Sequence, residues 1–243
     1  MTVHRIEPAP ESTVNVFSAE HEPLLAVDSR DTIIVRSLDA RGYLERQEFP
    51  GDTGKRTMFS GQTRGHCLNR PIAVRGAVPG SMLAVQIDSL TPDVWGWTHA
   101  QAMPDSALSR RLRPIGAEPA WLLWEIDNAA GTATANGKYT RPIAPFLGVT
   151  GVAPAGTGEH STIPPRTEAG GNIDCKELVA GSTLYLPVNT RDALLYLGDG
   201  HAAQGDGESC GTAIECGMTT QVVVGLASGR PLSSVHAQTP AGS

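Results

Sequence analysis

The sequence predicts a mainly β fold, either a sandwich or a distorted barrel with few short helices. Short apolar runs, rich in β-branched or aromatic residues, recur along the chain and are bounded by turn-forming residues. The 27 glycines and 18 prolines are scattered over the 243 residues, so they separate one run from the next. Long helical periodicity is hard to find. We interpret residues 1–243 as one domain.

Each predicted strand is a short apolar run between turn formers. Pro187 lies inside the fourth run and marks an edge strand or a bulge. Residues 189–192, between the fourth and fifth runs, predict a hairpin loop, and the small polar segment 127–139 predicts an exposed hairpin or loop. Residues 101–112 predict a short helix. The six runs are residues 32–36, 82–87, 122–126, 184–188, 193–197 and 221–226.

Composition excludes several classes of protein. The 19 basic residues are outnumbered by 25 acidic ones, and the net charge of -6 argues against a nucleic-acid binder. The chain has no apolar run long enough to span a membrane and no signal-peptide pattern at residues 1–11, so we expect a cytoplasmic protein. The four cysteines form no Cys-x-x-Cys pair, which argues against a zinc knuckle.

Chemically versatile side chains are densest at residues 198–208, GDGHAAQGDGE. Asp199 and His201 are two residues apart, so an extended backbone would place both on one face. A carboxylate and an imidazole on one face form half of a zinc-type site, and the third ligand could come from Asp206, Glu208 or a distant loop. Taken alone, this spacing also fits a solvated acidic loop.

Two further segments carry candidate site residues. In residues 161–176, STIPPRTEAGGNIDCK, the alternation of Asn172, Asp174 and Lys176 predicts one shared face if the backbone is extended. His66 precedes a strand-like segment, and it fits a hydrogen-bonded structural histidine as well as a ligand.

Five longer sequence motifs resemble those of one known family. They are HCLNRPIAVRGAVPG (66–80), GVTGVAPA (148–155), STIPPRTEAGGNID (161–174), LPV (186–188) and GDGHAAQGDGESCGTAIE (198–215). Together, and in this order, they resemble the acetamidase/formamidase family over most of the chain. The resemblance implies a mainly β fold, hydrolysis of short amides to carboxylate and ammonia, a bound divalent metal, and oligomers.

The same resemblance points to individual residues. It points to Asp174, Asp199, His201 and Glu208 as the metal site, of which some would touch the metal and others support it; we expect Asp174, Asp199 and His201 to be the ligands. Zinc suits histidine with carboxylates, although calcium or manganese would also accept the oxygen ligands. His66, Asp206 and Glu215 are additional candidates for the site.

These residues suggest hydrolysis by attack of a metal-bound water on the amide carbonyl. Glu208 would act as the base, and Lys176 or Asn172 would donate to the developing oxyanion. Two alternatives remain open. Cys210 could serve as a nucleophile with Glu208 and Lys176, or the chain could be a non-catalytic β module that binds a metal or another ligand.

Substrate size and assembly are also predicted. Aromatic residues are only 5% of the chain and the four tryptophans lie outside the motifs, so we expect formamide- or acetamide-sized substrates. Relatives continue well past residues 221–226, whereas this chain ends at residue 243, as a short variant or a truncated copy would. We therefore expect residues 222–224 to form an uncovered strand and the protein to be a homo-oligomer.

Overall fold

A computed structural model describes residues 1–60, 65–100, 110–111, 114, 120–228 and 233–242. It confirms the mainly β prediction, and no helix in these ranges is long and apolar enough to cross a membrane. The predicted helix at 101–112 lies almost wholly outside the described residues. The strands are β1 (Val3–Ile6), β2 (Thr13–Val14), β3 (Val16–Phe17), β4 (Leu25–Val27), β5 (Thr32–Ser37), β6 (Leu68–Asn69), β7 (Ile72–Val74), β8 (Met82–Ala100), β9 (Ala120–Asp127), β10 (Thr132–Ala135), β11 (Tyr139–Pro142), β12 (Phe146–Val152), β13 (His160–Ser161), β14 (Gly170–Asn172), β15 (Thr183–Pro187), β16 (Leu195–His201), β17 (Glu215–Leu226) and β18 (His236–Gln238), and the short 3-10 helix η2 spans Asp206–Glu208.

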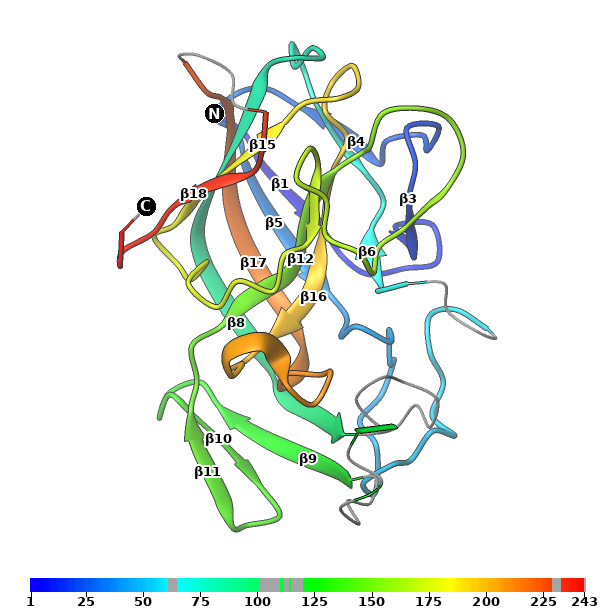
Figure 1. Ribbon diagram of the computed structural model, residues 1–243, viewed down its shortest axis with the longest axis vertical. Helices are drawn as coiled ribbons and strands as arrows, with labels where there is room; N and C mark the ends of the chain where they lie inside the picture. Colours follow the sequence, from blue (N-terminus) through cyan, green and yellow to red (C-terminus); the bar gives the residue numbers. More distant parts are fainter. Residues whose placement is uncertain (61–64, 101–109, 112–113, 115–119, 229–232, 243) are drawn as a thin grey trace.

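One large sheet organises the chain (Figure 1). Its main path runs in the order β11, β10, β9, β8, β17, β16, β12, β14. β8 is the longest strand and pairs with β9, β15 and β17, and β17 pairs in addition with β5 and β16. β3 and β13 form a separate two-stranded sheet. This order brings β14, β12, β16, β17 and β8 into one continuous surface, on which the candidate site is built.

All six predicted strands exist, but their extents differ from the prediction. β8 and β17 are far longer than the apolar runs that revealed them, and β16 continues through His201, so residues 198–201 are strand and not loop. The segment 127–139 belongs to the β9–β10–β11 meander, as the hairpin prediction requires. β12 was not predicted, although all seven of its residues are buried.

Two expectations about connectivity are wrong. β15 pairs with β8 and β18, and β16 with β6, β7, β12 and β17, so residues 189–192 do not close a hairpin between them. The expected uncovered strand is interior. Val222 and Val224 are buried, and the strand that contains them is flanked by β5 on one side and β8 on the other.

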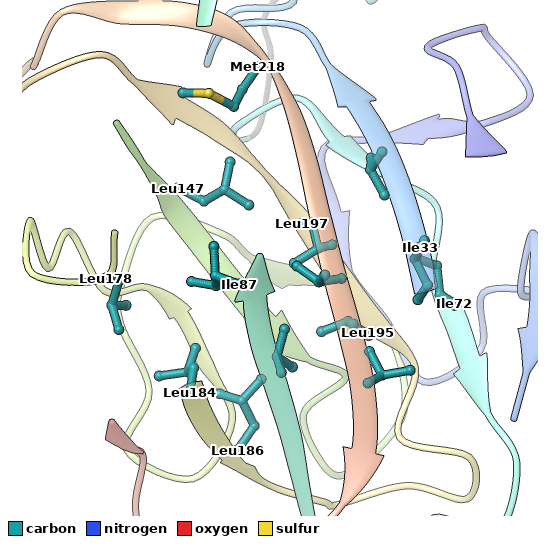
Figure 2. Close-up of a cluster of buried hydrophobic side chains, with 14 of the residues drawn as sticks. Ile33, Ile72, Ile87, Leu147, Leu178, Leu184, Leu186, Leu195, Leu197 and Met218 are labelled. Carbon is teal, nitrogen blue, oxygen red and sulfur yellow. The ribbon is translucent and has the colours of Figure 1, made fainter. Parts of the chain in front are cut away.

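The main hydrophobic core packs against the first half of β16 (Figure 2). Leu195 and Leu197 of that strand meet Ile72 of β7, Ile33 of β5 and Ile87 of β8 in one buried cluster. Each fully buried aliphatic side chain of this kind contributes about 1.5–3 kcal/mol by leaving water. The core therefore fixes the position of the strand whose second half carries the densest motif.

Candidate active site

The GDGH segment is the second half of β16, and its glycines are required by close packing. A Cβ on Gly198 would lie 2.7 Å from the Cys67 carbonyl oxygen, and one on Gly200 would lie 2.6 Å from the Cβ of Met218. Neighbouring strands therefore approach β16 more closely than any other residue type would allow. Asp199 and His201, which alternate with these glycines, line a cavity of about 280 Å³.

Three of the acidic residues on this cavity have a left-handed backbone. The φ angle is 48° at Asp174, 61° at Asp199 and 44° at Glu208. For residues other than glycine this conformation costs about 1–3 kcal/mol each and persists only where the surrounding structure enforces it. Such strain is typical of functional sites, and here it directs carboxylates toward one point.

That point is the imidazole of His201. Its Nε2 lies 3.5 Å from Asp199 Oδ1 and 3.3 Å from Glu215 Oε2, and its Nδ1 lies 3.8 Å from Asp174 Oδ1. Nδ1 also lies 2.8 Å from Oε1 of Gln204, whose amide nitrogen donates to the Asp174 carbonyl. Because Gln204 Oε1 can only accept, Nδ1 carries a proton and Nε2 faces the carboxylates.

Three carboxylate oxygens around His201 have no hydrogen-bond partner. Asp174 Oδ1, Asp199 Oδ1 and Glu215 Oε2 are all buried without a hydrogen bond, a rare state for such groups. Their ligand atoms form two overlapping groups, Asp174 with Asp199 and His201, and His201 with Glu208 and Glu215, each within 4.8 Å. We call these five residues the acidic cluster.

Gly148 of β12 forms the floor of this cluster. A Cβ at this position would lie 2.7 Å from His201 Cε1 and 2.8 Å from Asp174 Oδ1, and would also collide with Asp199. The space is therefore kept free by the absence of a side chain. Hard oxygen donors with one imidazole, left unpaired around such a space, fit a divalent cation.

Charge repulsion within the cluster is visible in its pKa values. Burial, together with the Asp199 carboxylate, raises the pKa of Asp174 to about 6, and burial with Asp174 raises that of Glu208 to about 8. Burial acts in the opposite direction on His201, but Glu215 and Asp199 outweigh it and raise the His201 pKa. A bound cation would relieve this repulsion and favour the ionised carboxylates.

The chain is similar to proteins of one known family. The model of the Acetamidase/Formamidase family matches residues 4–158 and 155–238. The chain belongs to this family. A Schizosaccharomyces pombe protein that is named as a formamidase by inference is 26% identical over 246 residues, which cover 80% of this chain. The chain spans only 59% of that relative's length. The formamidase of Methylophilus methylotrophus is 49% identical over 67 residues, which cover 27% of this chain and 16% of that protein.

Solved structures of the family have the same fold. The crystal structure of an acetamidase from Bacillus halodurans superposes with a TM-score of 0.80 at 28% identity, covering 96% of this chain and 74% of that one. A predicted acetamidase/formamidase from Thermoanaerobacter tengcongensis gives a TM-score of 0.80 at 25% identity, covering 98% of this chain and 74% of that one. These likenesses support the mainly β architecture.

Within this family member, two further predicted residues reach the cavity. His66 Nε2 lies 3.8 Å from Asp199 Oδ2, and the backbone nitrogen of His66 donates to Thr162 Oγ1 at 2.8 Å. Asn172 donates through Nδ2 to the carbonyl of Ile163 at 3.0 Å, while its Oδ1 is buried without a partner. Both side chains line the same cavity as the acidic cluster.

Three predicted residues are not brought into the cavity lining. The Lys176 ammonium pairs with Asp206 at 2.5 Å, and neither residue is part of the cavity lining. Residues 172–176 do not form the extended stretch on which a shared face depended, because Asp174 has a left-handed φ. The Cys210 thiol donates to the Thr212 carbonyl at 3.1 Å, outside the lining.

Sequence reasoning did not find Arg41, Trp97 and His99, which also line the cavity. Trp97 and His99 lie two residues apart on β8, with ring centroids 5.4 Å apart and nearly parallel planes. Arg41 follows β5 and places Nη2 3.1 Å from His99 Nε2. Alternation within WGWTHA was the available signal, since it predicts a shared face for Trp97 and His99. Arg41 has no comparable signal.

Proposed function

We propose that this chain catalyses metal-dependent hydrolysis of short-chain amides, of the formamide or acetamide class, to a carboxylate and ammonia. One observation carries the proposal. Unpaired, buried carboxylate oxygens converge on His201 in a cavity, in a chain of the Acetamidase/Formamidase family. A cation that satisfies those oxygens would also supply the chemistry that amide hydrolysis needs.

Asp174, Asp199 and His201 would hold the ion, and zinc fits this donor set, with manganese or calcium as alternatives. A divalent ion polarises the substrate carbonyl and lowers the pKa of water, so that a nucleophile is available at neutral pH. Gln204 orients His201 by accepting a hydrogen bond from its Nδ1–H group, which leaves Nε2 as the ligand atom.

The remaining polar residues would handle protons and developing charge. Glu208 lines the cavity and would take a proton from the attacking water and return it to the leaving nitrogen. Glu215 is held by the Ala213 backbone nitrogen, 2.9 Å from Oε1, with Oε2 facing His201. Asn172 lines the cavity and retains one amide hydrogen beyond its bond to Ile163, so it is better placed to stabilise an oxyanion than Lys176, which pairs with Asp206 outside the lining.

Metal dependence can be tested directly. Elemental analysis of the purified protein should find one or two divalent ions per chain, and ammonia should be released from formamide or acetamide. A chelator should abolish turnover, and adding zinc back should restore it. Full activity in protein shown to be free of metal would exclude this mechanism.

The observed contacts do not favour the alternative nucleophile. The Cys210 thiol is engaged with a backbone carbonyl, and its predicted partner Lys176 is paired with Asp206. The cytoplasmic location and the homo-oligomer remain predictions from the sequence and from the family resemblance.

A further inference from the structure

One cationic side chain lines the same cavity as the acidic cluster. The Arg41 guanidinium carbon lies 5.3 Å from the ring centroid of Trp97 and 5.4 Å from that of Trp121. Nη2 of Arg41 meets His99 at 3.1 Å. We call Arg41, Trp97, His99 and Trp121 the basic wall. Within the described part of the chain, Arg41 forms no ion pair with a carboxylate, although four carboxylates line the cavity.

His99 cannot neutralise this charge. An arginine can only donate, so His99 Nε2 must accept from it, and the ring proton is on Nδ1. Burial, together with Arg41, lowers the pKa of His99 to about 4, so the ring is neutral at neutral pH. Thr212 fixes its backbone, because Oγ1 accepts from the His99 nitrogen at 3.0 Å and donates to the His99 carbonyl at 2.8 Å.

Within the described residues, the Arg41 guanidinium donates only to His99 Nε2. The two indole rings contact the guanidinium, and one of its five N–H groups is directed at His99. The buried Nδ1 of His99 has no hydrogen-bond partner either. A planar guanidinium with free N–H groups is the preferred protein partner of a carboxylate, which it can bind with two parallel hydrogen bonds.

The cavity is larger than the smallest amides require. At roughly 30 Å³ for each water-sized group, acetamide and one attacking water fill about half of its 280 Å³. Arg41, Trp97 and His99 of the basic wall line this cavity, together with Ile163. A substrate that extends from the acidic cluster to Arg41 would use this space and satisfy the free donors.

We propose that Arg41 is a specificity-determining residue that binds a substrate carboxylate at the end of the acyl chain opposite the amide. Monoamides of short dicarboxylic acids are then the preferred substrates. This inference rests on the amidase function proposed above. The reaction is unchanged. A water oxygen bonds to the amide carbon, the C–N bond breaks, and the nitrogen takes a proton and leaves as ammonia, so the products are a dicarboxylate and ammonium.

The test compares succinamate with levulinamide, its neutral isostere that ends in a methyl ketone. Ammonia release by the metal-loaded wild-type protein should give a kcat/KM about 10- to 100-fold higher for succinamate, the range expected for a charge-assisted pair. Arg41→Met keeps an unbranched stem against the indoles and should reduce this ratio to about one. Arg46→Met removes the same charge from a solvated pair with Glu125, outside the cavity, and should leave the ratio unchanged.

The outcomes separate this inference from the amidase proposal. If the wild type hydrolyses both amides equally well, the role of Arg41 is excluded and the amidase function stands. If Arg41→Met slows both substrates equally, Arg41 is structural. A metal-loaded wild type that hydrolyses no amide overturns both proposals. If Arg41→Met does not fold, inhibition of the wild-type protein provides the test. Succinate should bind at least about 10-fold more tightly than butyrate. Equal inhibition by the two acids would contradict the inference.

Discussion

The acidic cluster and three residues of the basic wall (Arg41, Trp97 and His99) line one cavity, yet the two regions are positioned by different physical means. The acidic cluster is attached to strands that approach so closely that Gly148, Gly198 and Gly200 are required. The basic wall is held by ring stacking, by the hydrogen bond between Arg41 and His99, and by the two hydrogen bonds between Thr212 and the His99 backbone. Backbone packing of the first kind allows little adjustment, whereas the half-buried Arg41 side chain can be replaced with the fold intact. The contrast suggests a fixed reaction centre beside an adjustable selectivity surface.

The two regions also differ in the kind of hydrogen-bond partner that they lack. The acidic cluster has buried acceptors without donors, and in the basic wall the buried Nδ1 of His99 is a donor without an acceptor among the described residues. Buried polar groups in this state normally bind a ligand or water. A cation and an acceptor-bearing substrate would satisfy both regions at once, so substitutions in the two regions should have distinguishable effects.

His201→Ala should have the largest effect. It removes the imidazole shared by both ligand groups, so bound metal and ammonia release should be lost together. Changing a residue that only supports a metal ligand costs roughly 10- to 100-fold, and the loss here should exceed that. His236→Ala, at an exposed histidine on β18, is the matched control. Wild-type metal content in His201→Ala would show that the cluster does not bind the ion through this residue.

Gly148→Ala should have the next largest effect and tests whether packing fixes the reaction centre. The added methyl group would press on His201 and Asp174, so metal affinity should fall by roughly 10- to 100-fold while the strands still form. Gly205→Ala is the control, because no atom lies within 4 Å of the added Cβ and φ there is -81°. Metal titration and thermal unfolding of both variants measure the difference. Equal metal affinity would contradict a rigid floor.

The fold was predictable from sequence where strands are apolar. Residues 32–36 and 221–226 were predicted correctly because β-branched runs bounded by turn formers have few other ways to be buried. β12 was missed because Gly148 and Gly151 interrupt its apolar run, and both glycines are required by close neighbours. The last four residues of β16 were taken for a loop for the same reason. Glycine signals a loop and a close approach equally well in a single sequence.

The site was predictable where ligands share a motif. The short spacing of Asp199 and His201 survived the left-handed φ at Asp199, because their side chains still meet at 3.5 Å. Arg41 and His99 are 58 residues apart and have no local pattern. They meet only because β5 and β8 both pair with β17, which brings the segment after β5 beside the end of β8 (Figure 1). No local spacing encodes that pairing.

Cys210→Ser should have the smallest effect, and it tests whether anything outside the two regions carries the chemistry. Cys210 is adjacent in sequence to Gly211, which lines the cavity, but its own thiol donates to the Thr212 carbonyl. A serine hydroxyl can make the same bond, so kcat/KM for acetamide should stay within about twofold of the wild type, as for most substitutions away from a site. A nucleophilic thiol would behave differently, because a hydroxyl without an activating base is a far weaker nucleophile. Ammonia release and metal content should be measured on the same sample. An inactive Cys210→Ser that retains its full complement of metal would identify a covalent mechanism, and the acidic cluster would then serve to bind a cation without activating water.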